Sequence, residues 1–224
     1  MPQRHVFCRG CSLLHADRLS DHGCISFAKL LLIMISRSIN NVTVAGVSPP
    51  STDHVHFTNR PQITGAIGPS IIHSLNAASF RVQALTRRRQ TSSIPQTVDI
   101  VEVNYNDDNA LSKVLRHQDA VVSCLGDVPA AVQAQDSLLK ASLAAGVKRF
   151  VPSEFGSDTT NPHVRSYPFF RAKVEHQQRL RQATRSYPGF SFSLLITGPC
   201  LDWGLSKVPF IINVGSRTAE GIVP

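Results

Sequence analysis

The chain has 224 residues, 42% of them hydrophobic and 17% charged, which is enough for one well-packed domain and the beginning of another. Its net charge of +8 is not gathered into a basic stripe interleaved with aromatic side chains, and this argues against nucleic acid as a partner. No apolar run approaches the length that crosses a bilayer, so no membrane partner is expected.

The N-terminal residues 1–40 carry no periodic pattern, and we expect them to form a disordered extension. Met34 is a candidate natural start just before the first predicted strand. The five cysteines are scattered and odd in number, which predicts reduced thiols in a cytoplasmic protein. Those near the N-terminus lack the second closely spaced ligand pair of a zinc site, so no metal is expected.

The next segments predict a strand and a helix separated by an interruption. Residues 41–46 are short, β-branched and end on glycine, as in a buried strand. Residues 64–75 predict a glycine turn that runs into a helix with one apolar face, to which Ile67 belongs. Between them, residues 49–63 contain three prolines and no periodicity, and they predict an inserted loop.

Without the loop, Gly46, Gly65 and Gly68 would stand close to the spacing of a dinucleotide-binding fingerprint. In that motif the first glycine makes a tight turn, the second lets the backbone approach a pyrophosphate, and the third lets the helix pack on the strand. An ordinary glycine loop before a surface helix is the alternative, because the motif counts only in its strand–turn–helix context.

A second cofactor signal follows the predicted strand at residues 80–86. Arg87 and Arg88 stand where a dinucleotide-binding fold contacts the adenosine ribose, and no carboxylate stands at that position. An acid there binds the 2′-hydroxyl of NAD, whereas arginine accommodates the 2′-phosphate of NADP. The sequence therefore favours NADP(H), with a solvated basic turn as the alternative.

The rest of the chain alternates between strands and helices. Strands are predicted at residues 98–103, 119–126, 148–152 and 190–196, and helices at 109–117 and 132–145. This alternation predicts a doubly wound parallel α/β sheet with right-handed crossovers. Ligands bind at the carboxyl ends of such strands. Those ends carry polar, basic or glycine residues, among them Gly46, Arg87, Asn104, Gly126 and Ser153.

The run Ala145-Gly-Val-Lys-Arg-Phe-Val-Pro-Ser-Glu-Phe-Gly156 resembles a segment of the NmrA-like and isoflavone reductase-like family, a group of atypical short-chain dehydrogenases. Thr197-Gly-Pro-Cys-Leu-Asp-Trp-Gly204 and Asp119-Ala-Val-Val-Ser123 resemble two further landmarks of that family. The resemblance spans about residues 41–218. Residues 49–63 depart from the family pattern, as an intervening segment left in the gene model or as a genuine insertion.

The resemblance implies a Rossmann-type NAD(P)-binding domain over residues 41–204, with only the start of a smaller substrate lobe over 205–224. It implies an NADPH-dependent reductase of small molecules, aromatic ones among them, which the insertion and the short lobe would impair. The alternative is a dinucleotide-sensing regulator like NmrA itself, which binds cofactor and a protein partner without turnover.

The family's chemistry points to Lys173. The usual short-chain dehydrogenase pair of tyrosine and lysine is absent, because Tyr167 is followed four positions on by Arg171. In the family a lysine at the place of Lys173 is proposed to assist proton transfer while NADPH delivers hydride. Lysine suits this role because burial and neighbouring cations can favour its neutral form. A solvated helix lysine is the alternative.

Together with the strand-end argument, the resemblance predicts cofactor contacts at Gly46, Gly65, Ile67, Gly68, Arg87, Arg88, Asn104, Gly126, Ser153 and Phe155. Cys124 is expected to pack in the core. His163 and His176 receive no role from the sequence.

Overall fold

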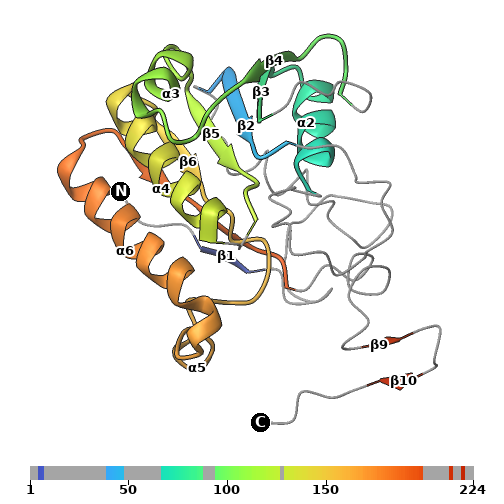
Figure 1. Cartoon of the computed structure of the whole chain (residues 1–224), viewed down its shortest axis with the longest axis vertical. Helices are drawn as coiled ribbons and strands as arrows, with labels where there is room; N and C mark the ends of the chain where they lie inside the picture. Colours follow the sequence, from blue (N-terminus) through green and yellow to red (C-terminus); the bar gives the residue numbers. More distant parts are fainter. Residues whose placement is uncertain are drawn as a thin grey trace, which may run out of the picture.

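A computed structural model describes residues 39–47, 67–87, 94–126 and 129–198, together with the backbone of short strands at 5–7, 212–213 and 218–219. At its centre is a six-stranded parallel sheet in the order β4-β3-β2-β5-β6-β7 (Figure 1). Its strands are β2 (Asn41–Ala45), β3 (Arg81–Thr86), β4 (Asp99–Glu102), β5 (Ala120–Ser123), β6 (Arg149–Val151) and β7 (Ser191–Phe192). The predicted doubly wound fold is confirmed.

Helices cover both faces of the sheet, which explains why the residues of its central strands β2 and β5 are almost all buried. Helix α2 (Gly68–Ala77) lies on one face, and α3 (Asp108–Val114), α4 (Pro129–Ala144) and α6 (Arg171–Ser186) lie on the other (Figure 1). Val42 in β2 is fully buried and stands opposite Val82 of β3 and Ala120 of β5. Cys124 is buried in the α2-side core, as predicted.

The helix ends are set by local chemistry that the apolar pattern does not show. Helix α3 begins at Asp108 because the side chain of Asp107 accepts a hydrogen bond from the Ala110 amide at 2.9 Å. It ends at Val114, short of the predicted residue 117, and His117 adopts a left-handed backbone with φ of 65°. A left-handed residue cannot continue a right-handed helix.

The last predicted strand, residues 190–196, is divided in the structure. β7 pairs with β6, while β8 (Leu194–Ile196) pairs in parallel with β1 (His5–Phe7) near the N-terminus. The division falls at Ser193, whose amide donates to the Phe150 carbonyl at 3.0 Å and whose hydroxyl accepts from Arg149 at 3.2 Å. The prediction of one continuous strand was therefore wrong.

Four short elements lie in the C-terminal part of the chain. Helix α5 (Pro162–Arg165) and a 3-10 turn (Pro168–Phe170) lead into α6, and β9 (Ile212–Asn213) pairs antiparallel with β10 (Thr218–Ala219). Across the described ranges, none of the helices has the length and apolar character needed to pass through a membrane.

Candidate cofactor site at the carboxyl edge of the sheet

Gly46 directly follows β2 and occupies a position that no other residue type fits. Its φ is +83°, in the left-handed region that favours glycine. A Cβ placed on it would lie 2.8 Å from the carbonyl carbon and oxygen of Cys124 and from the Leu125 amide. The turn is therefore pressed against the end of β5, as expected of the first glycine of a nucleotide-binding turn.

The first two amides of this turn are bound inside the protein. The Gly46 amide donates to the Tyr105 hydroxyl oxygen at 3.1 Å, and the Val47 amide donates to the Leu85 carbonyl at 3.3 Å. An anion would instead meet the amino end of α2, where no side chain caps the helix and no acidic residue occupies the first turn. Such a helix end attracts phosphate through its free N–H groups and its dipole.

Gly68, the first residue of α2, lies close to the Gly46 turn. A Cβ on Gly68 would be 3.5 Å from the Gly46 carbonyl oxygen and from the Val47 side chain, which is an ordinary contact distance. The described backbone therefore does not require glycine here, contrary to the role expected of the third glycine. Ile67, the N-cap of α2, is half-buried, and Gly65 lies outside the described residues.

A hollow of about 470 Å³ opens beside the turn, at the ends of β3 and β4 and the first turns of α4. Its lining comprises Arg87, Glu102, Val103, Asn104, Tyr105, Asn106, Ala130, Gln133 and Ala134. The structure thus brings the predicted residues Arg87 and Asn104 into one space. Arg88 lies outside the described residues.

The hollow also contains an acid that sequence reasoning did not anticipate. Glu102 follows Arg87 by fifteen positions in the chain, but β3 and β4 are neighbours and Thr86 stands opposite Glu102. The expectation that no carboxylate accompanies the arginine is corrected accordingly. Both side chains are exposed, so either can meet a ligand.

Tyr105 forms the inner wall of the hollow and is only 5% exposed. Its hydroxyl accepts from Gly46 and donates to the Leu85 carbonyl at 3.4 Å. Burial raises the pKa of this hydroxyl well above its usual value, outweighing the hydrogen bond from Gly46 that lowers it. The group is thus a neutral donor and acceptor. Sequence reasoning missed Tyr105 because an aromatic residue after a strand has no pattern of its own.

The loop that follows β6 lies further along the carboxyl edge of the sheet, beyond β5. The Ser153 amide donates to the Gln135 side chain of α4 at 2.8 Å, and the Gly156 carbonyl accepts from the Gly198 amide at 3.0 Å. Phe155 packs against the α2-side core. Gly126 follows Leu125, whose amide lies against the Gly46 turn.

A buried polar network joins this loop to α6. The Glu154 carboxylate accepts from the Thr159 hydroxyl at 2.7 Å and from the Gln177 amide group at 3.0 Å, and all three residues are at most 2% exposed. Lys173 is half-buried in the first turn of α6, one helical turn before Gln177. The network therefore holds the helix that carries Lys173 against the loop.

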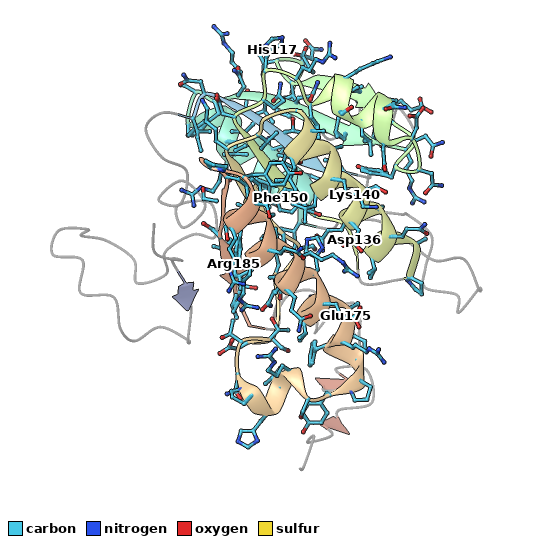
Figure 2. The ribbon with its side chains drawn as sticks, turned by 90° about the vertical axis from the view of Figure 1, so that its left-hand side faces the viewer. His117, Asp136, Lys140, Phe150, Glu175 and Arg185 are labelled. Atoms are coloured by element: carbon cyan, nitrogen blue, oxygen red, sulfur yellow. The ribbon has the colours of Figure 1, made fainter. Side chains whose placement is uncertain are left out.

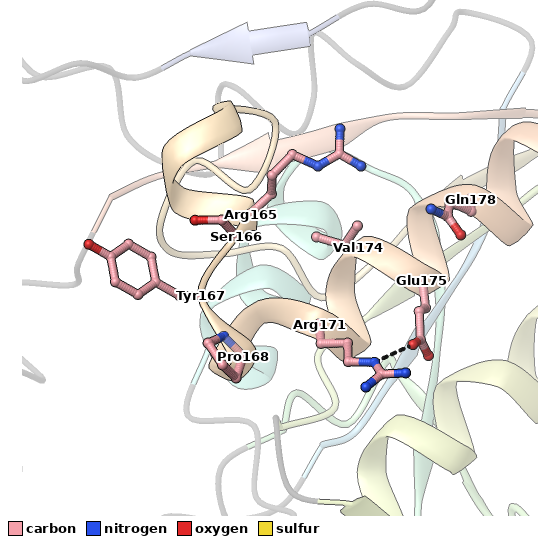
Figure 3. Close-up of a pocket in the computed structure, with 8 residues that line it drawn as sticks. All are labelled: Arg165, Ser166, Tyr167, Pro168, Arg171, Val174, Glu175 and Gln178. Carbon is pink, nitrogen blue, oxygen red and sulfur yellow. Dashed lines mark hydrogen bonds and ion pairs between the residues drawn. The ribbon is translucent and has the colours of Figure 1, made fainter.

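Tyr167 and Arg171 lie away from this edge network, around a second hollow of about 440 Å³ at the amino end of α6 (Figure 3). Tyr167 is 56% exposed and points away from Arg171. Arg171 is paired instead with Glu175 at 2.9 Å. The geometry agrees with the sequence in excluding a tyrosine–lysine pair at these positions.

His176 acquires a clear structural role. Its ring Nδ1 lies 2.7 Å from Asp136 of α4, which also pairs with Arg179 at 3.1 Å. Asp136 faces α6 across the gap between the two helices (Figure 2). The available sequence signal was the helical spacing of His176 with the buried Leu180 and Ala183, which places it on the inward face.

A parallel sheet in this strand order, with a glycine turn after its central strand and a hollow at its carboxyl edge, defines a Rossmann-type nucleotide-binding domain. The chain belongs to the NmrA-like family, whose sequence profile matches residues 62–207. The match begins next to the end of the predicted inserted loop, although β2, which precedes the loop, lies in the middle of the sheet.

Relatives extend the comparison. The oxidoreductase poxI of Penicillium oxalicum is 31% identical over 152 residues, which is 66% of this chain and 46% of that protein. The NADPH complex of leucoanthocyanidin reductase from Vitis vinifera is 26% identical with a TM-score of 0.50, over 69% of this chain and 46% of that chain. An isoflavone reductase structure is 25% identical with a TM-score of 0.50, over 71% and 49%. The chain thus spans about half the length of the proteins it matches.

Proposed function

We propose that this chain is the nucleotide-binding part of an NADPH-dependent reductase of small molecules, with aromatic compounds as the first class to test. The observation that carries the proposal is the pairing of the Gly46 turn with a hollow that contains Arg87 at the end of β3. The similarity to oxidoreductases and to a reductase–NADPH complex supports it.

The residues present fit NADPH in distinct ways. The hollow beside Asn104 and Gln133 has room and hydrogen-bonding groups for adenosine, and Arg87 would bind the 2′-phosphate. The amino end of α2 would face the pyrophosphate. Gly126, Ser153 and Phe155 belong to the strand ends that would border the nicotinamide. NADPH, when bound, supplies a hydride, and Lys173 would provide the proton that the reduced substrate takes up.

Cofactor preference provides the decisive experiment. NADPH and NADH are titrated by calorimetry against the wild type, Arg87→Glu and the control Arg116→Glu, which alters another exposed arginine just after α3. A charge-assisted phosphate contact is worth about 1.5–3 kcal/mol, so the wild type should prefer NADPH by roughly 10- to 100-fold. Arg87→Glu should abolish that preference, and Arg116→Glu should preserve it.

Two results would contradict the assignment: a wild-type preference for NADH, or a preference that Arg87→Glu leaves unchanged. Tight NADPH binding without oxidation of NADPH across a panel of aromatic and other small substrates would instead favour the regulator. A cytoplasmic location for this chain stays a prediction, which rests on its scattered cysteines.

A further inference from the structure

Tyr105 belongs to both halves of the candidate site. Tyr105 lines the hollow proposed for adenosine, and its hydroxyl is bonded to the glycine turn. The residue follows Asn104 just beyond β4, yet Gly46 is 59 positions away in the chain. One buried side chain therefore connects two subsites built from different strands.

The hydroxyl ties three adjacent strand ends together. It accepts from the Gly46 amide after β2 and donates to the Leu85 carbonyl of β3, while Tyr105 itself follows β4. The same Leu85 carbonyl also accepts from the Val47 amide. The amides of the first two residues of the turn are thus held by one hydroxyl and one carbonyl in a buried setting, where such bonds are costly to lose.

We propose that Tyr105 is a positioning residue for the cofactor, an inference that rests on the proposed function. Its hydroxyl fixes the Gly46 turn at the carboxyl edge of the sheet, in contact with the amino end of α2 that would face the pyrophosphate. A released Gly46 amide would be buried without a partner, and the turn would shift to satisfy it. The shift would alter the passage for the phosphates while leaving the adenosine hollow in place.

This division predicts a ligand-dependent effect of Tyr105→Phe. The phenylalanine ring still lines the hollow, so binding of adenosine 2′-monophosphate, which has no pyrophosphate, should change less than about twofold. NADPH binding should weaken by about tenfold, as expected for the loss of a buried hydrogen bond. Calorimetric titration of both ligands into the intact chain measures both values.

A matched control separates positioning from general weakening. Phe192→Leu alters a buried aromatic in β7, at the opposite edge of the sheet from β4, and should change neither affinity. Hydrogen exchange in the cofactor-free protein gives an independent measurement. The Gly46 amide should exchange at least about tenfold faster in Tyr105→Phe, relative to the Val44 amide in β2, because its bond partner is gone.

The outcomes are distinct. Equal NADPH affinity in wild type and Tyr105→Phe, or equal losses for both ligands, overturns the positioning role and leaves the proposed function intact. Unchanged Gly46 exchange also overturns it. A wild type that binds no NADPH overturns the proposed function, and the cofactor role of Tyr105 with it, whatever the exchange rates show.

Discussion

Two glycines of the candidate site, Gly46 and Gly68, should respond differently to replacement by alanine. Gly46→Ala places a methyl group 2.8 Å from the Cys124 and Leu125 backbone and forces an L-residue to a φ of +83°. We expect it to lower the free energy of unfolding by about 2–5 kcal/mol, from the left-handed backbone and the overpacking combined. Urea denaturation of the purified variant measures the change.

Gly68→Ala should be nearly neutral. Its methyl group would stand at an ordinary 3.5 Å from its nearest neighbours, and alanine restricts the unfolded chain more than glycine does. The same denaturation experiment should show a change within about 1 kcal/mol, in the stabilising direction. A large loss in Gly68→Ala, or none in Gly46→Ala, would show that the turn is built differently.

Lys173 is the residue on which turnover should depend. In a version extended to the full length of the matched relatives, Lys173→Ala should lower the rate of NADPH oxidation by about 10²–10⁴ and preserve NADPH affinity. Lys113→Ala, which alters an exposed lysine on α3, serves as the control and should do neither. An unchanged rate in Lys173→Ala would show that Lys173 is a helix lysine without a catalytic role.

The packing of α4 against α6 contains an ionic contact that predicts pH-dependent stability at the element scale. Burial raises the pKa of Asp136, but the hydrogen bond with His176 and the nearby cations outweigh it, so the net pKa lies below the ordinary 3.8. A carboxylate whose pKa is lowered by folding stabilises the folded state at every pH above the ordinary pKa of that carboxylate. That stabilisation is lost as the pH falls through the lowered value.

Asp136→Asn should therefore lower stability by about 1–2 kcal/mol near neutral pH, a figure reduced for the partial exposure of Asp136. The difference from wild type should shrink below pH 3.8, where the wild-type carboxylate also becomes protonated. Thermal melting across this range measures it. Glu175→Ala breaks an exposed pair on α6 and should cost less than about 0.5 kcal/mol. A pH-independent difference would argue against the ionic contact.

The predicted inserted loop matters most at the scale of the whole molecule. Residues 49–63 lie outside the described residues, between the central strand β2 and helix α2, whose amino end would face the phosphates. Lengthening a loop costs little in closure entropy, about 0.6 kcal/mol per doubling, so the fold should tolerate it. The phosphate site should be weakened by the loop, because the N–H donors of such a site must be held on one short turn.

Joining Ser48 directly to Thr64 should therefore tighten NADPH binding and leave the melting temperature nearly unchanged. A second version, in which residues 49–63 become a glycine–serine chain of equal length, separates the effect of length from that of side chains such as Asp53 and Arg60. If the shortened protein and wild type bind NADPH equally, the loop is accommodated outside the crevice and does not weaken the site.

Local sequence determined the layered architecture of this protein. Short β-branched apolar runs alternating with helical spacing can bury their side chains only in a parallel sheet covered on both faces, and that sheet is present. The same local reasoning placed Gly46, Arg87 and Asn104 at carboxyl strand ends, because every strand of such a sheet runs in one direction. These features depend on residues near one another in the chain.

Only the tertiary structure decided which of those strand ends meet. Glu102 joins Arg87 because β4 pairs with β3, and Tyr105 reaches Gly46 because β4, β3 and β2 are consecutive in the sheet. His176 finds Asp136 because α4 and α6 pack on the same face, and the last strand divides because β8 pairs with β1. Each contact joins residues far apart in sequence, and strand order and helix packing, which bring them together, leave no periodic trace in the chain.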